Sequence, residues 1–260
     1  MKKFLAITIL ILLAAGKIFA QSVQEISEGP KILVLNYHQV QNSHTSLAVS
    51  ISDFDAQMHY LSSHGYVTIT PDELYSGLNG ELELPKKPVL ITFDDGYADN
   101  YTNAFPILQY YGMRATIFVI PAFVGVYQNY LTWDELREME NGGITIESHT
   151  MHHYKLEELP DDEIRTELLN SKQILEENLG HSVEFLAYPT GTYNLHIAGI
   201  AKEVGYKGAF TIKYGNVDLG SNFYALERVP IFNTAQNTMK DFYERIEYRQ
   251  SFEEFGWIKK

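Results

Sequence analysis

The sequence of 260 residues contains no cysteine and has no excess of basic side chains. Without cysteine, the chain cannot form disulfide bonds or supply thiolate ligands to a metal ion. Its 20 lysines and arginines face 33 aspartates and glutamates, which gives a net charge of −13. Such a charge argues against nucleic acids and anionic membranes as partners. The chain also lacks internal repeats, low-complexity tracts and linkers rich in proline or serine.

The sequence has one long apolar run, and it lies at the N-terminus. Met1–Lys3 is basic, residues 4–15 are almost entirely apolar, and small residues lead to Ala20. This order is typical of a secretory signal peptide, so we expect cleavage near Ala20–Gln21 rather than an uncleaved anchor. The run is short for a spanning helix, which needs about 20 apolar residues. We therefore expect an exported protein that is periplasmic, secreted or associated with the cell envelope, with no transmembrane segment in the mature chain.

An apolar run at residues 88–92 leads directly into the motif TFDDGY at Thr92–Tyr97. An apolar run that ends in a turn signal indicates a buried strand of a parallel sheet. Asp94 and Asp95 therefore fall where the strand ends, which is where α/β folds bind ligands. Two carboxylates so close together cannot both remain free anions in a dry site. Either one of them is protonated or a cation lies between them.

A pair of histidines offers further ligands for such a cation. His149 and His153, in the motif ESHTMHH, follow another short predicted strand. At this spacing, one turn of helix or a tight loop brings two imidazoles together. One aspartate oxygen and two neutral imidazole nitrogens leave the fourth position of a tetrahedral metal open, as in catalytic zinc sites. The sequence predicts a divalent metal, for which Zn²⁺ is favoured and Co²⁺ or Ni²⁺ would also fit.

Predicted strands and helices alternate along the chain. This alternation predicts an α/β fold in which helices wrap a parallel sheet, and seven or eight strands favour a closed barrel. The length after residue 20 suits a single domain over residues 21–260. The expected strands are residues 31–40, 67–70, 88–92, 115–120, 144–147, 184–188, 207–212 and 224–231, and the expected helices are residues 52–63, 71–78, 103–111, 132–140, 160–179, 195–204 and 239–246.

Three motifs resemble those of the polysaccharide deacetylases, the NodB-homology enzymes of carbohydrate esterase family 4. They are TFDDGY, the pair of histidines, and AYPTG at Ala187–Gly191. The resemblance covers roughly residues 30–235. It implies a distorted (β/α)7–8 barrel of the NodB-homology type and a metal-dependent hydrolase that removes acetyl groups from sugars.

The early motif NYH, at Asn36–His38, refines the resemblance. It is similar to the branch that deacetylates poly-β-1,6-N-acetylglucosamine in biofilms, in which the order of the barrel is circularly permuted. In that branch the acid histidine comes from the N-terminal strand rather than from a late Leu-x-His motif. No Leu-x-His follows residue 200 in this chain.

The resemblance implies a metal held by Asp95, His149 and His153, with Asp94 as the general base. A water activated by the metal would lose a proton to Asp94 and attack the acetyl carbon. The products would be acetate and a glucosamine unit of the polysaccharide.

The resemblance also implies an acid and an oxyanion site. His38, in its protonated form, would donate a proton to the leaving amine. The backbone N–H of Thr190 would stabilise the oxyanion, with Tyr188 beside it at the substrate. Most relatives carry an arginine at the position of Ala187, where it braces the base. Arg228 is a candidate for that role from a neighbouring strand.

Several alternatives remain open from the sequence alone. Asp94 and Asp95 could form an ordinary Asp-Gly turn, and His152 could replace His153 as a ligand. The substrate could instead be peptidoglycan, a chitooligosaccharide or O-acetylated xylan, and the chain could be a non-catalytic glycan-binding module. Nothing in the sequence fixes the oligomeric state, for which we favour a monomer. Three aromatic residues of one predicted loop could stack on sugar rings, namely Phe123, Tyr127 and Tyr130.

Overall fold

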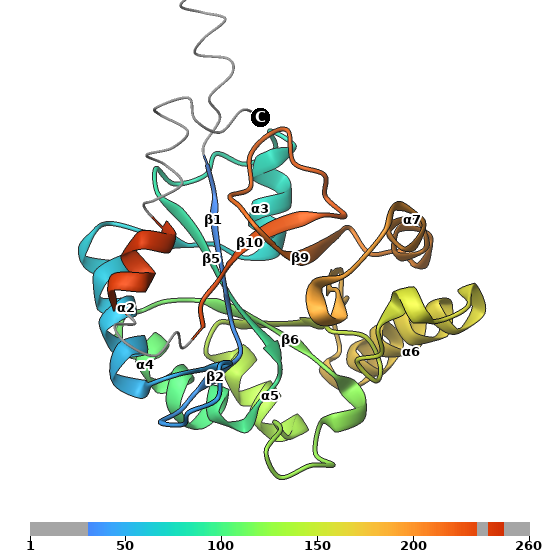
Figure 1. Ribbon diagram of the computed structural model, residues 1–260, viewed down its shortest axis with the longest axis horizontal. Helices are drawn as coiled ribbons and strands as arrows, with labels where there is room; N and C mark the ends of the chain where they lie inside the picture. Colours follow the sequence, from blue (N-terminus) through green and yellow to red (C-terminus); the bar gives the residue numbers. More distant parts are fainter. Residues whose placement is uncertain (1–30, 233–238, 247–260) are drawn as a thin grey trace, which may run out of the picture.

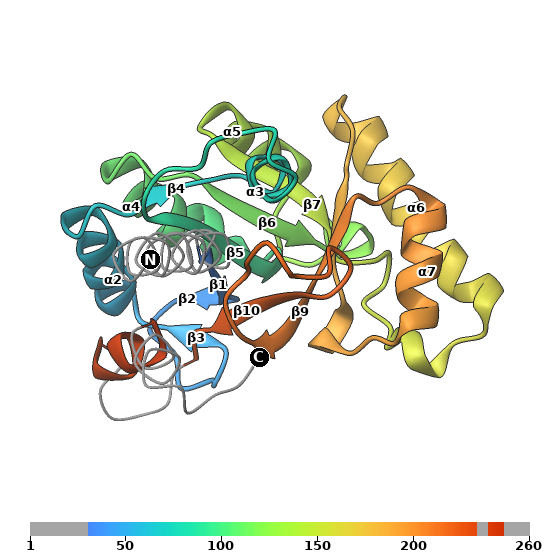
Figure 2. The ribbon, with the colours of Figure 1, turned by 90° about the horizontal axis from the view of Figure 1, so that it is seen from above.

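The computed structural model describes residues 31–232 and 239–246. The expected signal peptide at residues 1–20 and both ends of the expected domain lie outside the described residues. In the part that is described, no helix combines the length and the apolar character needed to cross a bilayer. Parallel strands occupy the centre of the molecule, and helices surround them (Figures 1 and 2).

Within residues 31–232, seven strands form a closed parallel ring. The first strand of the ring, β1, pairs with both β5 and β10 and so joins the two edges of the sheet. The strands follow one another around the ring in chain order, which confirms the expected (β/α) barrel with seven strands. These strands are β1 (Leu33–Tyr37), β5 (Pro88–Asp95), β6 (Ala115–Val119), β7 (Ile144–Ser148), β8 (Phe185–Ala187), β9 (Gly208–Tyr214) and β10 (Leu226–Pro230).

Three short strands lie beside the ring. β4 (Val67–Thr68) pairs with the start of β5, whereas β2 (Gln39–Val40) and β3 (Ala48–Val49) pair with each other in a separate sheet. The single strand expected at residues 31–40 is therefore wrong, because the chain leaves the ring at His38. Beyond that point it has no ring neighbour and takes a new pairing partner.

The helices begin where local sequence provides capping groups. The side chains of Thr70 and Thr132 each close a capping box with a glutamate three residues later. The helix α2 is capped by Ser50, whose side chain accepts the backbone N–H of Asp53. The helices are α2 (Ile51–Ser63), α3 (Pro71–Leu78), α4 (Phe105–Tyr110), α5 (Trp133–Asn141), α6 (Asp161–Leu179), α7 (Leu195–Val204) and a last helical segment at residues 239–246.

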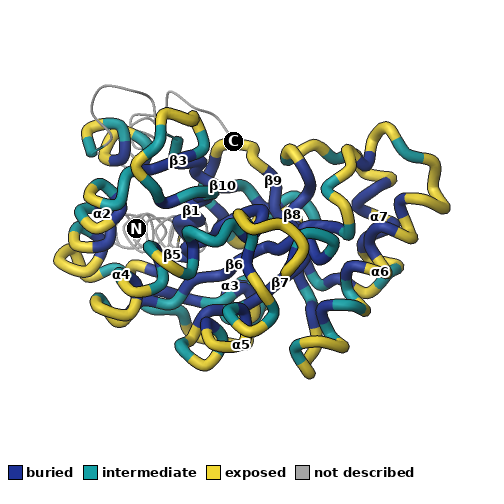
Figure 3. The backbone as a smooth tube through the Cα atoms, turned by 90° about the horizontal axis from the view of Figure 1, so that it is seen from below, coloured by how far each residue is buried: buried dark blue, intermediate teal, exposed yellow. Residues whose placement is uncertain are grey.

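The core divides into two clusters on the two sides of the ring. Alternate residues of a strand face opposite sides, so Ile117 and Val119 of β6 join the larger cluster with the helices, while Phe118 joins the smaller one. The smaller cluster consists mainly of strand residues, including Phe185 and Phe210, and fills the interior of the ring. Figure 3 shows the buried strands at the centre and the exposed outer faces of the helices. Because the strands are parallel, their carboxyl ends meet at one rim of this filled barrel.

Candidate metal centre and active site

The first motif lies at the rim because the whole of β5 is buried between its neighbours. All eight residues of this strand are buried, and its last two residues are Asp94 and Asp95. Asp95 has a φ of 73°, and Gly96 continues the left-handed turn with a φ of 79°. This turn aims the two adjacent carboxylates in different directions.

Asp95 meets the two histidines of the second motif. Its Oδ1 lies 3.4 Å from Nε2 of His149 and 3.5 Å from Nε2 of His153. The three ligand atoms all lie within 4.8 Å of one another, so they could bind a single ion. Asp95 and His149 are buried, while the side chain of His153 is partly exposed. The metal site therefore opens towards solvent on the side of His153.

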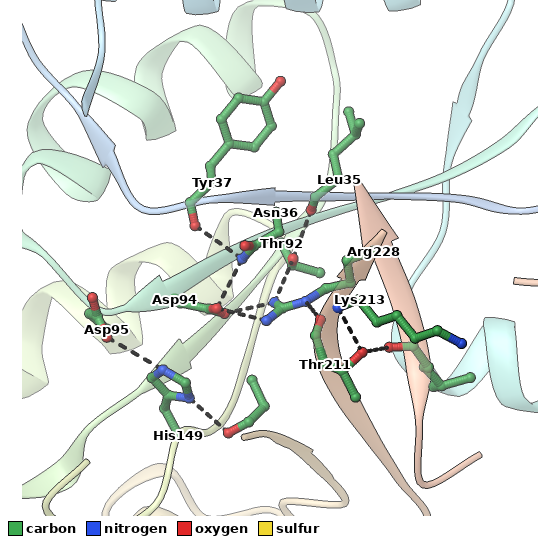
Figure 4. A network of polar contacts seen from close by, with 12 residues as sticks. Leu35, Asn36, Tyr37, Thr92, Asp94, Asp95, His149, Thr211, Lys213 and Arg228 are labelled. Atoms are coloured by element: carbon green, nitrogen blue, oxygen red, sulfur yellow. Dashed lines mark hydrogen bonds and ion pairs between the residues drawn. The ribbon is translucent and has the colours of Figure 1, made fainter. Parts of the chain in front are cut away.

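The donor set also fits a cation chemically. Nδ1 of His149 lies 2.8 Å from the carbonyl oxygen of Ala187, so this nitrogen carries the proton and donates it (Figure 4). In the neutral ring Nε2 then has a lone pair that faces the carboxylate of Asp95. A proton or a metal ion is needed between two such acceptors. A carbonyl that holds the other nitrogen of a histidine is the usual outer partner of a metal ligand.

The pKa values of the two histidines differ in direction. Burial lowers the pKa of His149, but the carboxylates of Asp94 and Asp95 outweigh it, so the pKa is raised above its ordinary value. Burial and the neighbouring His149 lower the pKa of His153 to about 4. Without a metal, a proton on Nε2 of His149 would satisfy the carboxylate of Asp95 that faces it.

We expect metal affinity to fall as the pH drops through the raised pKa of His149, because the ion must displace that proton. His153 is already neutral there and contributes no proton. At about pH 6, below the raised pKa of His149, zinc binding should release about one proton per ion from that ring. Isothermal titration calorimetry in buffers of different ionisation enthalpy measures this number. Zinc binding without proton release at about pH 6 would contradict the assignment.

The histidine loop is held by a carboxylate of α6. Glu167, which is buried, accepts hydrogen bonds from the backbone N–H of His152 at 2.8 Å and from its Nδ1 at 2.6 Å. The ring of His152 is thereby turned to Glu167, so the geometry does not support it as an alternative ligand. The hydroxyl of Thr150 accepts the N–H of His153 at 3.1 Å.

We expect Glu167→Ala to weaken zinc binding by about 10- to 100-fold, because the loop that presents His153 loses its anchor. A competition titration with a chromophoric chelator measures the change. Glu163→Ala, an exposed change one turn earlier on the same helix, is the matched control. Equal zinc affinities for the two variants would show that the loop holds its shape without Glu167.

Asp94 is bound by three donors that are not part of the histidine cluster. Nη1 and Nη2 of Arg228 donate to its two oxygens at 2.8 and 2.7 Å, and Nδ2 of Asn36 donates to Oδ2 at 2.9 Å. The side chain of Arg228 is completely buried, and its remaining donors bind the hydroxyl of Thr92 and the carbonyl of Thr211. Figure 4 shows the dashed lines that join the carboxylate of Asp94 to Asn36 and Arg228.

The structure thus brings Arg228 to Asp94, the expected base, although not from an adjacent strand. β10 pairs with β1 and β9, and the guanidinium reaches past β1 to the end of β5. Burial by itself raises the pKa of Asp94, but Arg228 and His149 outweigh it and hold the pKa well below its ordinary value. Asp94 is therefore a fixed anion.

His38 lies in the gap between β1 and β2 and shares the electrostatic field of the carboxylates. Burial lowers its pKa, and Asp94 and Asp95 oppose that shift only in part. The expected protonated form is therefore not the resting state at neutral pH. Within the described residues, the buried Nδ1 of His38 has no hydrogen-bond partner.

The third motif presents one backbone donor. Thr190 is exposed with a φ of 57°, and no described residue accepts a hydrogen bond from its backbone N–H. Gly191 follows, where an added Cβ would lie 2.7 Å from the backbone nitrogen of Ile212, so no larger residue fits. Tyr188 is different: its N–H donates to Phe210 and its hydroxyl to Tyr224. We correct its expected contact with substrate to a packing role, because neither group is free.

Backbone strain is concentrated in the three motifs. In the described part of the chain, the non-glycine residues with positive φ are Asp95, Thr150, His153 and Thr190. Each such conformation costs on the order of 1 kcal/mol or more and persists only where its surroundings enforce it. The fold thus stabilises an unfavourable backbone at the positions that form this rim.

The three predicted aromatic residues form a cluster next to the first motif. The ring of Phe123 packs edge-on against Tyr127 and Tyr130 at 5.2 and 4.9 Å, and Tyr130 stacks on Tyr97 at 5.0 Å. Tyr127 is about half exposed. These rings lie close to Asp95, which adds to the raised pKa of Tyr97 after the larger effect of burial.

Sequence reasoning missed two residues of the site. Asn36 received no role, although it lies two positions before His38 and hence on the same face of an extended strand. Glu167 was also missed. It and the buried Ser171 are polar residues within the apolar stripe of α6, and such a misfit is a signal of a buried polar contact.

Comparison with known proteins agrees with this geometry. The profile of the family described as polysaccharide deacetylase matches residues 81–209. A protein of Bacillus subtilis (strain 168) assigned as a polysaccharide deacetylase, YxkH, is 38% identical over 201 residues, which are 77% of this chain and 71% of that protein. The poly-β-1,6-N-acetyl-D-glucosamine N-deacetylase of Staphylococcus aureus (strain MRSA252) is 30% identical over 270 residues, with 89% and 92% of the two chains covered.

A solved structure extends the similarity to the fold. The Streptococcus pyogenes deacetylase PplD, determined in complex with acetate, superposes with a TM-score of 0.76 and 31% identity. The alignment covers 79% of this chain and 95% of that one. From the barrel, the rim and these relatives together, the chain belongs to the polysaccharide deacetylases, the NodB-homology family of enzymes.

Proposed function

We propose that this deacetylase is a metal-dependent hydrolase that removes N-acetyl groups from an extracytoplasmic polymer of N-acetylglucosamine. Poly-β-1,6-N-acetylglucosamine is the favoured substrate. The observation that carries the proposal is the cluster of Asp95, His149 and His153, next to a second carboxylate, Asp94, that is not part of the cluster. The name of the S. aureus relative supports the choice of polymer, and the signal-like N-terminus supports export.

Asp95, His149 and His153 would hold the metal, for which Zn²⁺ best suits two nitrogens and one carboxylate. When bound, such an ion acts as a Lewis acid that polarises the acetyl carbonyl and acidifies water. Asp94 would accept a proton from the attacking water as a new bond forms between the water oxygen and the acetyl carbon. Three donors fix its orientation, and because its pKa is low, Asp94 would hold the accepted proton only briefly before releasing it to solvent.

The leaving amine needs a proton before the C–N bond can break. The minor protonated form of His38 would supply this proton to the nitrogen, and the electron pair of the broken bond stays with the amine. Because the pKa of His38 is lowered, the protonated imidazole is a strong acid for this step. The free N–H of Thr190 would donate to the oxyanion. Acetate and a glucosamine unit are the products.

The exposed ring of Tyr127 and its aromatic neighbours support a sugar as the substrate, since aromatic rings pack well against apolar ring faces. The high net negative charge favours a polymer that gains amines as the reaction proceeds. Both observations suit a glucosamine-type product.

The deciding experiment is acetate release by the metal-reconstituted protein on four polymers side by side. We expect the fastest release from poly-β-1,6-N-acetylglucosamine, and loss of release when the metal is chelated. Faster release from peptidoglycan, chitooligosaccharide or O-acetylated xylan would overturn the choice of polymer. Binding of a polymer with no acetate release from any of them would show a glycan-binding module instead.

A further inference from the structure

The polypeptide around His38 is fixed by side chains from a distant segment. His38 occupies a one-residue gap between β1 and β2, so no strand partner binds its carbonyl. Instead, Nδ2 of Asn100 donates to that carbonyl at 2.8 Å. Oδ1 of Asp99 accepts the N–H of Val40 at 2.9 Å, and Nδ2 of Asn103 donates to the carbonyl of Val40 at 2.8 Å. We call Asp99, Asn100 and Asn103 the clamp.

Two members of the clamp also bind each other. Asn100 is fully buried, and its Nδ2 also donates to Oδ1 of Asp99 at 3.0 Å. All three residues lie at a single turn of π-helix, Asn100–Ala104, that precedes α4. π-Helical turns are rare and occur often at functional sites. The clamp begins four residues after Asp95. One continuous stretch of chain therefore carries the expected metal ligand and also binds the backbone at His38 and Val40.

We propose that Asp99, Asn100 and Asn103 are positioning residues that place the imidazole of His38 at the leaving amine, an inference that rests on the proposed role of His38 as the acid. Hydrogen bonds to the imidazole itself do not do this, since within the described residues the buried Nδ1 of His38 is unpartnered. Its ring contacts that of Phe232 only loosely, with centroids 6.2 Å apart. The ring is therefore placed through its backbone.

The clamp matters because a general acid must lie at a defined distance from the atom that it protonates. A general acid works only within hydrogen-bond reach of the atom it protonates. A shift of about 1 Å in a reacting group can cost about 10²-fold in rate. In this barrel, β1 ends at Tyr37 and the chain then leaves the ring, so His38 is the first residue without strand pairing to hold it. The clamp replaces the missing pairing.

The test compares two leaving groups in the zinc-loaded protein. Asn100→Ala removes the donor to His38 and should lower kcat on the N-acetylglucosamine polymer by about 30- to 100-fold, with KM nearly unchanged. An aryl acetate ester, whose phenolate leaves without a proton, should be cleaved within about threefold of the wild-type rate. The ratio of amide to ester turnover is the readout, because a general loss of folded protein lowers both.

His38→Ala is the reference and should lower the same ratio. The double variant should fall no further, because the two changes act on one step. Ile164→Val, a mild core change in α6, and Asn178→Ala, which removes a hydrogen bond from a side chain to the backbone on the surface, should leave the ratio unchanged. Zinc affinity should match the wild type in every variant.

An unchanged ratio in Asn100→Ala, together with a lowered ratio in His38→Ala, would overturn the clamp and leave the acid assignment intact. An unchanged ratio in His38→Ala, or a wild type inactive on the amide, would overturn the proposed acid or the proposed function, and the clamp with it. Should Asn100→Ala fail to fold, Asn103→Ala serves with the same readout. Faster hydrogen exchange at the Val40 amide in Asp99→Ala would support the clamp without any assay of activity, and unchanged exchange would overturn it.

Discussion

Replacing Arg228 with alanine should lower turnover by at least about 10²-fold and destabilise the fold by about 3–5 kcal/mol. The guanidinium is fully buried and binds both oxygens of Asp94, so its loss leaves a buried carboxylate with Asn36 as its remaining side-chain partner. The pKa of Asp94 would then rise, because burial would no longer be opposed by the adjacent cation. Chemical denaturation and acetate release measure the two effects.

Two further variants separate orientation from charge. Arg228→Lys keeps the charge but loses the paired hydrogen bonds, so it should recover part of the stability and little of the turnover. The double variant Asp94→Asn with Arg228→Met removes both charges. It should regain much of the lost stability while remaining inactive, because a buried pair is costly chiefly when it is broken on one side. Wild-type turnover in Arg228→Ala would refute the bracing role.

The neighbouring aspartates should respond in opposite ways to the same isosteric change. Asp94→Asn should lower turnover by about 10³-fold or more while zinc still binds, because a proton acceptor is lost but no ligand. Asp95→Asn should weaken zinc binding by about 10²-fold or more and lose activity at ordinary metal concentrations. Zinc titration followed by acetate release at saturating zinc distinguishes the two.

Two results would contradict these roles of Asp94 and Asp95. If Asp94→Asn lost zinc and Asp95→Asn kept it, the roles of the two residues would be exchanged. If neither change altered acetate release, the chain would bind glycans without hydrolysing them. The distances favour the stated assignment, since the histidine nitrogens lie at Asp95 and the guanidinium lies at Asp94.

Local sequence patterns predicted most of the helices and strands, but they did not predict two interruptions of regular secondary structure. The strand expected at residues 31–40 breaks at His38, and the helix expected at residues 103–111 is preceded by a π-helical turn at Asn100–Ala104. The two departures are linked, because Asn100 binds the carbonyl of His38. Neither segment alone contains a signal for a contact between residues 62 positions apart.

The sequence by itself determined the alternation of strands and helices, the parallel barrel that follows from it, and the residue types of a metal site at the ends of strands. These follow from side-chain periodicity and from the fixed direction of parallel strands, which act over a few residues. Only the tertiary structure decided which groups meet. It brought Arg228 and Asn36 to Asp94, turned His152 to Glu167 and left Tyr188 without a free polar group. Such choices depend on ring closure, which brings residues together across distances that no local pattern records.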